Sequence, residues 1–293
     1  MRYLISIATF RRPDDLERLL DSLEASIDDR ASVVVTDNDP NESARPIVER
    51  HPLSPVYLVE PVPGIAHARN RGLSLFTEDF EAVIFLDDDE WAEPDWFHQM
   101  TRFVETHHAG VVQGPVITVL PKDAPEWIAR GGFYQRRLRD NGTELPSAAT
   151  NNTVLRRDAW LVAGSPLFDP AFSETGGSDW DLFWGIRKAG AKIMYCADAV
   201  VSEEVPPSRL SKAWLRQRYI RNGIVEARVR RKHGDPLVGF VARAIAAAGV
   251  GTLQLFTAYA LGRGLQARAL SRVLIPYGKI SGLLGKRIRE YKR

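Results

Sequence analysis

Four acidic residues stand together at Asp87, Asp88, Asp89 and Glu90, directly after the apolar run VIFL. Like charges this close repel one another, so the cluster calls for a positive group among them. Carboxylate oxygens suit Mg²⁺ and Mn²⁺, and an Asp-x-Asp at the end of a strand leaves coordination positions open for a diphosphate. An acidic turn on the surface is the alternative as long as nothing else supports the site.

Support comes from polar residues that follow other apolar segments. Thr9 follows YLISIA, Asp37 ends SVVVTD, and Arg69 lies in GIAHARNRG. Asp37 is suited to accept hydrogen bonds from a nucleobase or ribose, although a turn or capping role fits it nearly as well. An arginine fork at Arg69 can meet phosphate or a base edge, with a solvated helix face as the alternative.

The segments that position these residues alternate between the hydrophobic patterns of strands and of helices. Strands are expected at 3–8, 32–37, 56–60 and 82–87, and helices at 11–26 and 64–76. This order predicts an α/β fold with a mostly parallel sheet and helices on both faces. Ligands of such sheets bind beyond the carboxyl ends of the strands. We therefore expect Thr9, Asp37 and the aspartate cluster to share one rim.

The second half of the chain is read less easily. Residues 121–150 form an irregular stretch, which is long for a simple connection and suggests a functional loop. A helix is expected over 178–190, closed by its final glycine, and a strand over 192–197. Ser178 and Asp181 have the spacing of a capping box. Asp179 has no such structural role.

Taken in order, these segments resemble the family 2 glycosyltransferases, inverting enzymes of GT-A fold that use nucleotide-sugar donors. The similarity covers roughly residues 1–205 and lies in the order of IATFRRPDDLERLLDSL, VVVTDND, GIAHARNRGL, AVIFLDDDEW and SDWDLFWGIRKAG. Residues 201–223 are similar to the segment that follows the catalytic helix in bacterial exopolysaccharide glycosyltransferases.

The resemblance implies a role for several of these residues. The divalent ion, Mn²⁺ or Mg²⁺, would be bound by Asp89, and Asp87 would meet the ribose or the metal. The nucleotide-sugar would be held by Asp87 together with Thr9, Asp37, Arg69 and Asp88.

The resemblance also suggests a base and a third metal ligand. The family usually has Glu-Asp before its catalytic helix, whereas this chain has Ser178-Asp179, so Asp179 inherits the role of base and the glutamate position departs from the pattern. Many relatives place a metal-binding histidine after the following strand. Here that place holds Glu203 and Glu204; Glu203 is the candidate metal ligand, with a surface acidic pair as the alternative.

Charge is distributed unevenly along the 293 residues. Residues 1–207 hold 20 Lys+Arg against 34 Asp+Glu, whereas residues 208–293 hold 19 against 3. The predicted division is therefore a catalytic domain over 1–207, with a nucleotide-binding half at 1–120 and an acceptor half at 121–207, and a basic helical region over 208–293.

The basic region is expected to associate with a membrane. The stretch 244–261 has 18 residues without a charge, near the minimum for a bilayer span, but it is only mildly hydrophobic. A buried helix or an interfacial helix on an anionic surface is favoured over a span. No nucleic-acid partner is expected, because the basic residues lack interleaved aromatics. The single Cys196 and the short apolar run at the N-terminus indicate a cytoplasmic protein, peripheral to the inner face of the cell membrane.

Together with these observations, the resemblance implies a metal-dependent enzyme that moves one sugar from a nucleotide-sugar, in particular a UDP-sugar, to a lipid-linked saccharide in exopolysaccharide or cell-envelope glycan synthesis. Two alternatives remain. One is a non-catalytic membrane-binding protein on a degenerate transferase fold. The other is an Asp-x-Asp phosphohydrolase, which would place its motif after the first strand and a Thr or Val where this chain has Trp91.

Overall fold

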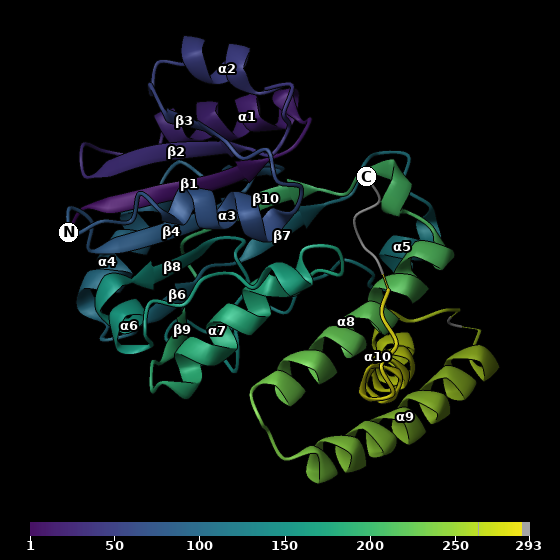
Figure 1. Cartoon of the computed structure of the whole chain (residues 1–293). Helices are drawn as coiled ribbons and strands as arrows, with labels where there is room; N and C mark the ends of the chain where they lie inside the picture. The colour runs from purple at the N-terminus through teal and green to yellow at the C-terminus, as the bar shows by residue number, and fades with distance from the viewer. Residues whose placement is uncertain (263, 289–293) are drawn as a thin grey trace. The chain divides into compact units, whose positions relative to one another are not determined.

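The computed structural model describes residues 1–262 and 264–288, and the chain divides into two compact units. The first unit contains residues 1–117, 136–173 and 178–203. The second contains residues 118–135 and 174–177 and the chain from residue 204 onward. Figure 1 shows the helices and strands of both units.

A seven-stranded sheet forms the centre of the first unit. Its strands lie in the order β3-β2-β1-β4-β8-β6-β9. Their bounds are β1 Tyr3–Thr9, β2 Ala31–Asp37, β3 Val56–Val59, β4 Ala82–Asp87, β6 Val111–Gln113, β8 Thr153–Arg156 and β9 Ile193–Tyr195. The first four along the chain are mutually parallel, as is the β6–β9 pair, and only β8 runs antiparallel to its neighbours. The predicted mostly parallel α/β sheet is confirmed.

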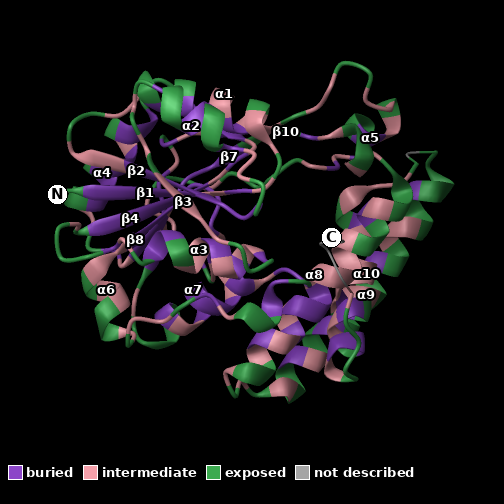
Figure 2. Cartoon of the chain, turned by 45° about the horizontal axis from the view of Figure 1, so that its top comes forward, coloured by how far each residue is buried: buried purple, intermediate pink, exposed green. Residues whose placement is uncertain are grey.

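Helices cover both faces of this sheet, so the first unit has three layers. Alternate residues of β1 point to opposite faces: Ile5 and Ile7 pack with α1 and α4, whereas Leu4 packs with α3 and α7. The central strands are buried along most of their length (Figure 2). The helices are α1 Pro13–Glu24, α2 Arg45–Arg50, α3 Ile65–Leu73, α4 Trp96–Thr106, α6 Arg157–Val162 and α7 Ser178–Lys188, with a 3₁₀ helix at Pro170–Phe172.

A small second sheet follows the aspartate cluster. Its order is β5-β10-β7, with β5 at Glu90–Ala92, β10 at Val201–Glu204 and β7 at Val116–Val119. The β5–β10 pair is antiparallel and places Glu203 opposite Glu90. The chain therefore brings a residue more than a hundred positions away back to the edge where the cluster begins.

Three long helices make up most of the second unit, namely α8 Lys212–Lys232, α9 Leu237–Ala260 and α10 Ala267–Leu283. The short helix α5 Glu126–Arg130 and a 3₁₀ helix at Pro207–Arg209 complete it. Ile128, Phe133 and Leu215 form its buried centre beside α5. By length and composition α9 is the single described helix that could cross a membrane, with a mean hydropathy of 1.5 and 17% of its most apolar window buried.

This division differs from the one expected from the sequence. Residues 118–135, which were expected in the acceptor half of the catalytic domain, pack with the C-terminal helices through Ile128 and Phe133, and residues 174–177 group with them as well. The second unit resumes at residue 204 rather than at 208. The last five residues of the predicted basic region, 289–293, lie outside the described residues.

Glycines let α8 and α10 pack closely. A Cβ added at Gly278 would lie 2.0 Å from the Ile220 carbonyl oxygen, and one added at Gly223 would lie 2.0 Å from that of Ile275. We expect Gly278→Ala to reduce the free energy of unfolding of the full chain by about 1–3 kcal/mol, because the helices must separate to admit the methyl group. Thermal or urea unfolding measures this change.

Gly249 of α9 provides the matched control, because a Cβ there would meet nothing within 4 Å. Gly249→Ala should be neutral or stabilise the helix by up to about 1 kcal/mol, since alanine is the better helix former. Equal effects of the two substitutions would contradict the close packing of α8 against α10.

Candidate active site

The ends of parallel strands bring the predicted residues to one rim of the large sheet. In the strand register Thr9 of β1 lies beside Asp37 of β2, and Ala8 lies beside Asp87 of β4. Asp88 and Asp89 form the turn from β4 to β5. The expectation that Thr9, Asp37 and the cluster share an edge is thus met by the backbone of the fold.

Asp88 is the most enclosed aspartate of the cluster. The Thr9 hydroxyl donates a hydrogen bond of 2.8 Å to its carboxylate, and Arg12 Nη1 donates one of 3.0 Å. Burial raises the pKa of Asp88 to about 7, with Arg12 opposing the rise and Asp89 adding to it. Arg12 also donates to Asp89 Oδ2 at 2.9 Å, so one guanidinium bridges two neighbouring carboxylates.

Asp87 lies beside a different arginine. Arg69 Nη2 donates to Asp87 Oδ1 at 3.0 Å, and the Arg69 side chain is largely buried. Desolvation raises the pKa of Asp87; Arg69 opposes this, and the charges of Asp89 and Asp179 add to it. The Asp87 side chain is 39% exposed, so solvent moderates the shift. The influence of Asp179 on Asp87 places the candidate base within electrostatic reach of the cluster.

Glu90 is the fully buried acid of the group. Its Oε2 accepts the Asp87 backbone N–H at 3.0 Å, which fixes the start of the turn. Its Oε1 is buried and has no hydrogen-bond partner among the described residues. The pKa of Glu90 is raised well above its usual range, chiefly by burial and then by the charge of Asp87.

Glu203 is paired with a third arginine. Arg136 Nη2 lies 2.6 Å from Glu203 Oε1, and the two side chains are 34% and 18% exposed. Arg136 belongs to the irregular stretch that precedes β8. Asp87, Asp89 and Glu203, the three residues proposed to bind a cation, are therefore held by Arg69, Arg12 and Arg136 respectively.

Asp37 is fully buried and its carboxylate is used within the protein. The Tyr57 hydroxyl donates to it at 2.9 Å, and the backbone N–H groups of Asp39 and Ala44 donate at 2.9 and 2.8 Å. These bonds shape the loop after β2. A contact from Asp37 to a nucleobase or ribose would have to share or replace one of them.

The start of α7 differs from the predicted capping box. The helix begins at Ser178 itself, directly after Gly176 and Gly177, which both have positive φ. The Ser178 hydroxyl is buried and has no partner among the described residues, so it does not cap the helix. Asp181 is buried, whereas Asp179 is partly exposed at the same end of the helix. The accessible carboxylate is the one assigned as base.

The cluster fits a divalent ion by the chemistry of its donors. All candidate ligand atoms are carboxylate oxygens, which are the donors that Mg²⁺ and Mn²⁺ prefer, and the neighbouring Glu90 Oε1 is a buried oxygen without a hydrogen-bond partner among the described residues. Each of the three candidate ligands forms an ion pair with an arginine. Among the described residues, three potential ligand atoms come within 4.8 Å of one another at Asp21, Glu24 and His51 instead.

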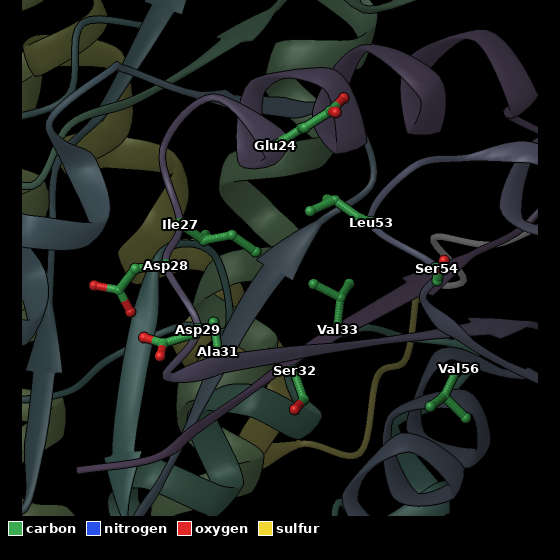
Figure 3. Close-up of a pocket in the computed structure, with 10 residues that line it drawn as sticks. All are labelled: Glu24, Ile27, Asp28, Asp29, Ala31, Ser32, Val33, Leu53, Ser54 and Val56. Carbon is green, nitrogen blue, oxygen red and sulfur yellow. The ribbon is translucent and has the colours of Figure 1, made fainter.

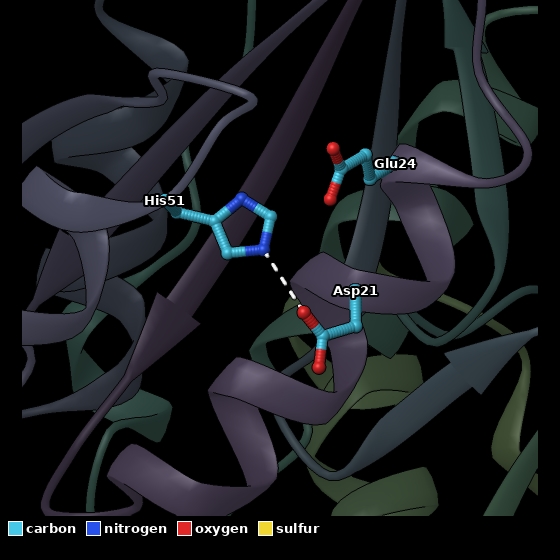
Figure 4. Close-up of side chains that lie close together, drawn as sticks. All are labelled: Asp21, Glu24 and His51. Atoms are coloured by element: carbon cyan, nitrogen blue, oxygen red, sulfur yellow. Dashed lines mark hydrogen bonds and ion pairs between the residues drawn. The ribbon is translucent and has the colours of Figure 1, made fainter.

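The group of Asp21, Glu24 and His51 lies at the opposite ends of the strands from the aspartate cluster. Asp21 and Glu24 are exposed near the end of α1, and His51 Nε2 lies 3.3 Å from Asp21 Oδ1 (Figure 4). Glu24 also borders a hollow of about 460 Å³ beside the first residues of β2 and β3 (Figure 3). Both features are at the amino ends of the strands, so neither belongs to the rim that carries the aspartates.

Sequence reasoning missed several residues of the site. Arg12 and Arg136 were not assigned, although both pair with acids that were. Arg12 could have been suspected, because it stands just after the first strand and before Pro13. Arg136 had no such signal, since it lies in a stretch without hydrophobic period. Asn70, the neighbour of Arg69, exchanges two hydrogen bonds with the backbone of Phe168.

Comparison with known sequences identifies relatives of this chain. Residues 4–160 match the family model described as glycosyl transferase family 2. The chain is 34% identical over 296 residues to the succinoglycan biosynthesis protein ExoM of Rhizobium meliloti, covering 98% of this chain and 94% of that protein. It is 28% identical over 170 residues to the glucosyl-dolichyl phosphate glucuronosyltransferase of Haloferax volcanii, covering 52% and 51%.

Solved structures share the fold. The mannosyltransferase PcManGT of Pyrobaculum calidifontis, in complex with GDP-Man and Mn²⁺, superposes with a TM-score of 0.67 at 18% identity and covers 98% of this chain and 88% of that one. Residues 1–349 of S. aureus TarS, in complex with UDP-GlcNAc, give 0.53 at 15% identity, with 98% and 93% covered. At these identities the likeness concerns the fold alone.

Proposed function

The chain belongs to the family 2 glycosyltransferases, and from this premise we propose that it is a divalent-ion-dependent, inverting enzyme that transfers one sugar from a nucleotide-sugar to a lipid-linked saccharide. The similarity to a succinoglycan biosynthesis protein over nearly the whole length supports a place in exopolysaccharide synthesis. A UDP-sugar is the donor we favour. The named neighbours bind UDP-GlcNAc and GDP-Man, so the test below includes both nucleotide classes.

One observation carries the proposal: carboxylates and arginines meet at the carboxyl ends of β1 and β4. The charge of Asp179 also acts on Asp87. This is the edge at which open α/β sheets bind ligands. Asp89, Asp87 and Glu203 would hold the ion, which supplies charge neutralisation for the departing diphosphate. Thr9, Asp37, Arg69 and Asp88 would contact the nucleotide-sugar.

The residues of the chain then perform a single displacement. Asp179 accepts the proton of the acceptor hydroxyl while that oxygen bonds to the anomeric carbon of the donor sugar. The bond from the same carbon to the diphosphate oxygen breaks on the opposite side, and the configuration inverts. Arg69 and Arg12, which pair with Asp87 and Asp89, would stabilise negative charge on the leaving group.

Release of nucleoside diphosphate tests this function. The full chain is mixed with a UDP- or GDP-sugar, Mn²⁺ and a mixture of bacterial lipid-linked saccharides. We expect release that depends on the saccharide lipids and stops with EDTA. Release from no donor in the panel, with the chain folded, would contradict a transferase and favour the non-catalytic alternative.

The acceptor is proposed to be lipid-linked because the second unit carries an exposed apolar helix. On α9, Ile245, Leu253 and Phe256 are 60%, 64% and 70% exposed and lie on one face, with spacings of eight and three residues. Basic side chains dominate the same region, with 19 Lys+Arg against 3 Asp+Glu from residue 208 on. This combination suits an interfacial helix on the anionic inner face of a cell membrane.

Flotation with anionic liposomes tests the membrane proposal. We expect the full chain to float at low salt and to be released in part at high salt, because screening removes the electrostatic attraction and leaves the apolar one. Leu253→Asp combined with Phe256→Asp should reduce the floating fraction several-fold at low salt. Point substitutions suit this test better than removal of 236–293, because α10 packs against both α8 and α9.

The matched control is Leu161→Asp combined with Val162→Asp, which changes two exposed apolar residues of α6 in the first unit. This variant should float like the parent. Unchanged flotation of the α9 variant would show that this face does not contact lipid. Flotation that no salt concentration reverses would indicate a spanning helix instead.

A further inference from the structure

Arg136 is the least expected member of the site. It reaches Glu203, which is the last residue of the first unit, from a stretch more than sixty positions earlier in the chain. Glu203 in turn lies opposite Glu90 in the β5–β10 pair. The positive charge of Arg136 and the negative charge of Glu203 both act on Glu90, so the three groups are electrostatic neighbours.

The role of this arginine follows from the charges around it. Glu90 is fully buried and cannot move away from Glu203 without breaking its hydrogen bond to the Asp87 backbone. Arg136 forms an ion pair with Glu203, and its side chain is 34% exposed, so it is accessible to an anion from solvent. If Arg136 left, the Glu203 carboxylate would lose this positive charge while it stayed opposite Glu90 and close to the aspartate cluster. A divalent cation would supply positive charge in its place.

We infer that Arg136 is a positioning residue that occupies Glu203 in the nucleotide-free protein and transfers to the donor diphosphate when a cation takes over Glu203. This inference rests on the proposed function. It assigns to Arg136 a guanidinium fork for phosphate, which arginine binds bidentately. The inference predicts that the two ligands are coupled. Without nucleotide, Arg136 competes with the cation for Glu203, whereas with nucleotide present Arg136 favours the simultaneous binding of cation and nucleotide.

Two binding measurements separate these effects. Mn²⁺ binding without nucleotide is followed by electron paramagnetic resonance of the free ion, and binding of UDP or GDP by calorimetry in Mn²⁺ or EDTA. Arg136→Gln should tighten Mn²⁺ binding without nucleotide by about fivefold, because it removes a competing ion pair. The same substitution should weaken nucleotide binding in Mn²⁺ by about tenfold, because one charge-assisted hydrogen-bonding group is lost.

Two further variants complete the design. Glu203→Gln should weaken Mn²⁺ binding and, because Arg136 loses its ion-pair partner, tighten nucleotide binding in EDTA several-fold. Arg137→Gln removes the same charge from the neighbouring exposed residue and should change every affinity by less than twofold. Thermal unfolding of each variant verifies that it is folded.

Opposite shifts of Mn²⁺ and nucleotide affinity in Arg136→Gln support the inference, since a merely structural arginine would weaken both. Parallel weakening, or no change in either affinity, overturns it. The Mn²⁺ titration needs no nucleotide, so its result does not depend on whether the chain binds UDP or GDP. Failure of the parent chain to bind either nucleotide would instead contradict the proposed function, and the two failures are thereby distinguished.

Discussion

Asp179→Asn should slow sugar transfer by a factor on the order of 10² or more while nucleotide binding stays intact. Asparagine keeps the shape of aspartate at the first turn of α7 but cannot accept the proton of the acceptor hydroxyl. Asp179 is partly exposed, and its charge reaches Asp87. Removing that charge should leave binding of the negatively charged donor unchanged or slightly tighter.

The measurement is the rate of nucleoside diphosphate release at saturating donor, together with nucleotide affinity from calorimetry. Asp181→Asn is the control, because it makes the same change two residues further along the helix at a buried position. Transfer by Asp179→Asn at close to the parent rate would refute the assignment. A similar loss in both variants, with lowered stability, would point to the helix rather than to the base.

The second large effect is expected at the cation-binding aspartate. Asp89→Asn should lower the Mn²⁺-dependent affinity for nucleotide by about 10²-fold or more, since a neutral amide oxygen is a poor substitute for a carboxylate ligand. The fold should persist. Arg12 would still pair with Asp88, and one source of repulsion inside the cluster would be gone.

Calorimetric titration of UDP or GDP in Mn²⁺ and in EDTA measures this effect. Asp95→Asn is the matched control: Asp95 is exposed, lies six residues further on, and its side chain does not cap α4. We expect the control to keep the full difference between Mn²⁺ and EDTA. If Asp89→Asn keeps that difference too, the ion binds elsewhere.

Much of the first unit could be predicted from local pattern. Four apolar runs with helical segments between them specify a parallel sheet, and each run ends at a polar residue, so Thr9, Asp37 and Asp87 had to meet at one rim. Helix α1 begins at Pro13 and buries the four leucines of its apolar face, as their spacing indicates. These features depend only on residues close in sequence and on the handedness of the connections.

Contacts between distant segments were not predictable in the same way. The pairing of Glu90 with Glu203 depends on the register of two short strands that are far apart in the chain, and strands of three and four residues carry little pattern. Arg136 reaches its partner from an irregular stretch. The packing of residues 118–135 with the C-terminal helices depends on Ile128 and Phe133. No hydrophobic periodicity in this stretch predicts that these two side chains are buried.

Local sequence motifs gave a wrong or incomplete prediction where the backbone conformation differed from the one that the motif requires. Ser178 and Asp181 have the spacing of a capping box, but the helix begins one residue too early for Ser178 to cap it, because two glycines with positive φ precede it. For Asp37, the sequence allowed either a turn role or a nucleotide contact. The observed hydrogen bonds from the backbone N–H groups of the following loop are those of a turn residue. A nucleotide contact stays a proposal.

The central claim is that the rim formed by Thr9, Asp87 and Asp89 binds a nucleotide-sugar together with a divalent ion. Thermal unfolding of the full chain with a panel of UDP- and GDP-sugars, each in Mn²⁺ and in EDTA, tests it most directly. A ligand that binds only the folded state raises the midpoint, and the rise grows with the logarithm of the ratio of ligand concentration to dissociation constant. We predict that one nucleotide class raises the unfolding temperature of the parent in Mn²⁺ but not in EDTA, and not in Asp89→Asn. Stabilisation that is equal in EDTA, or unaltered in Asp89→Asn, would contradict the account.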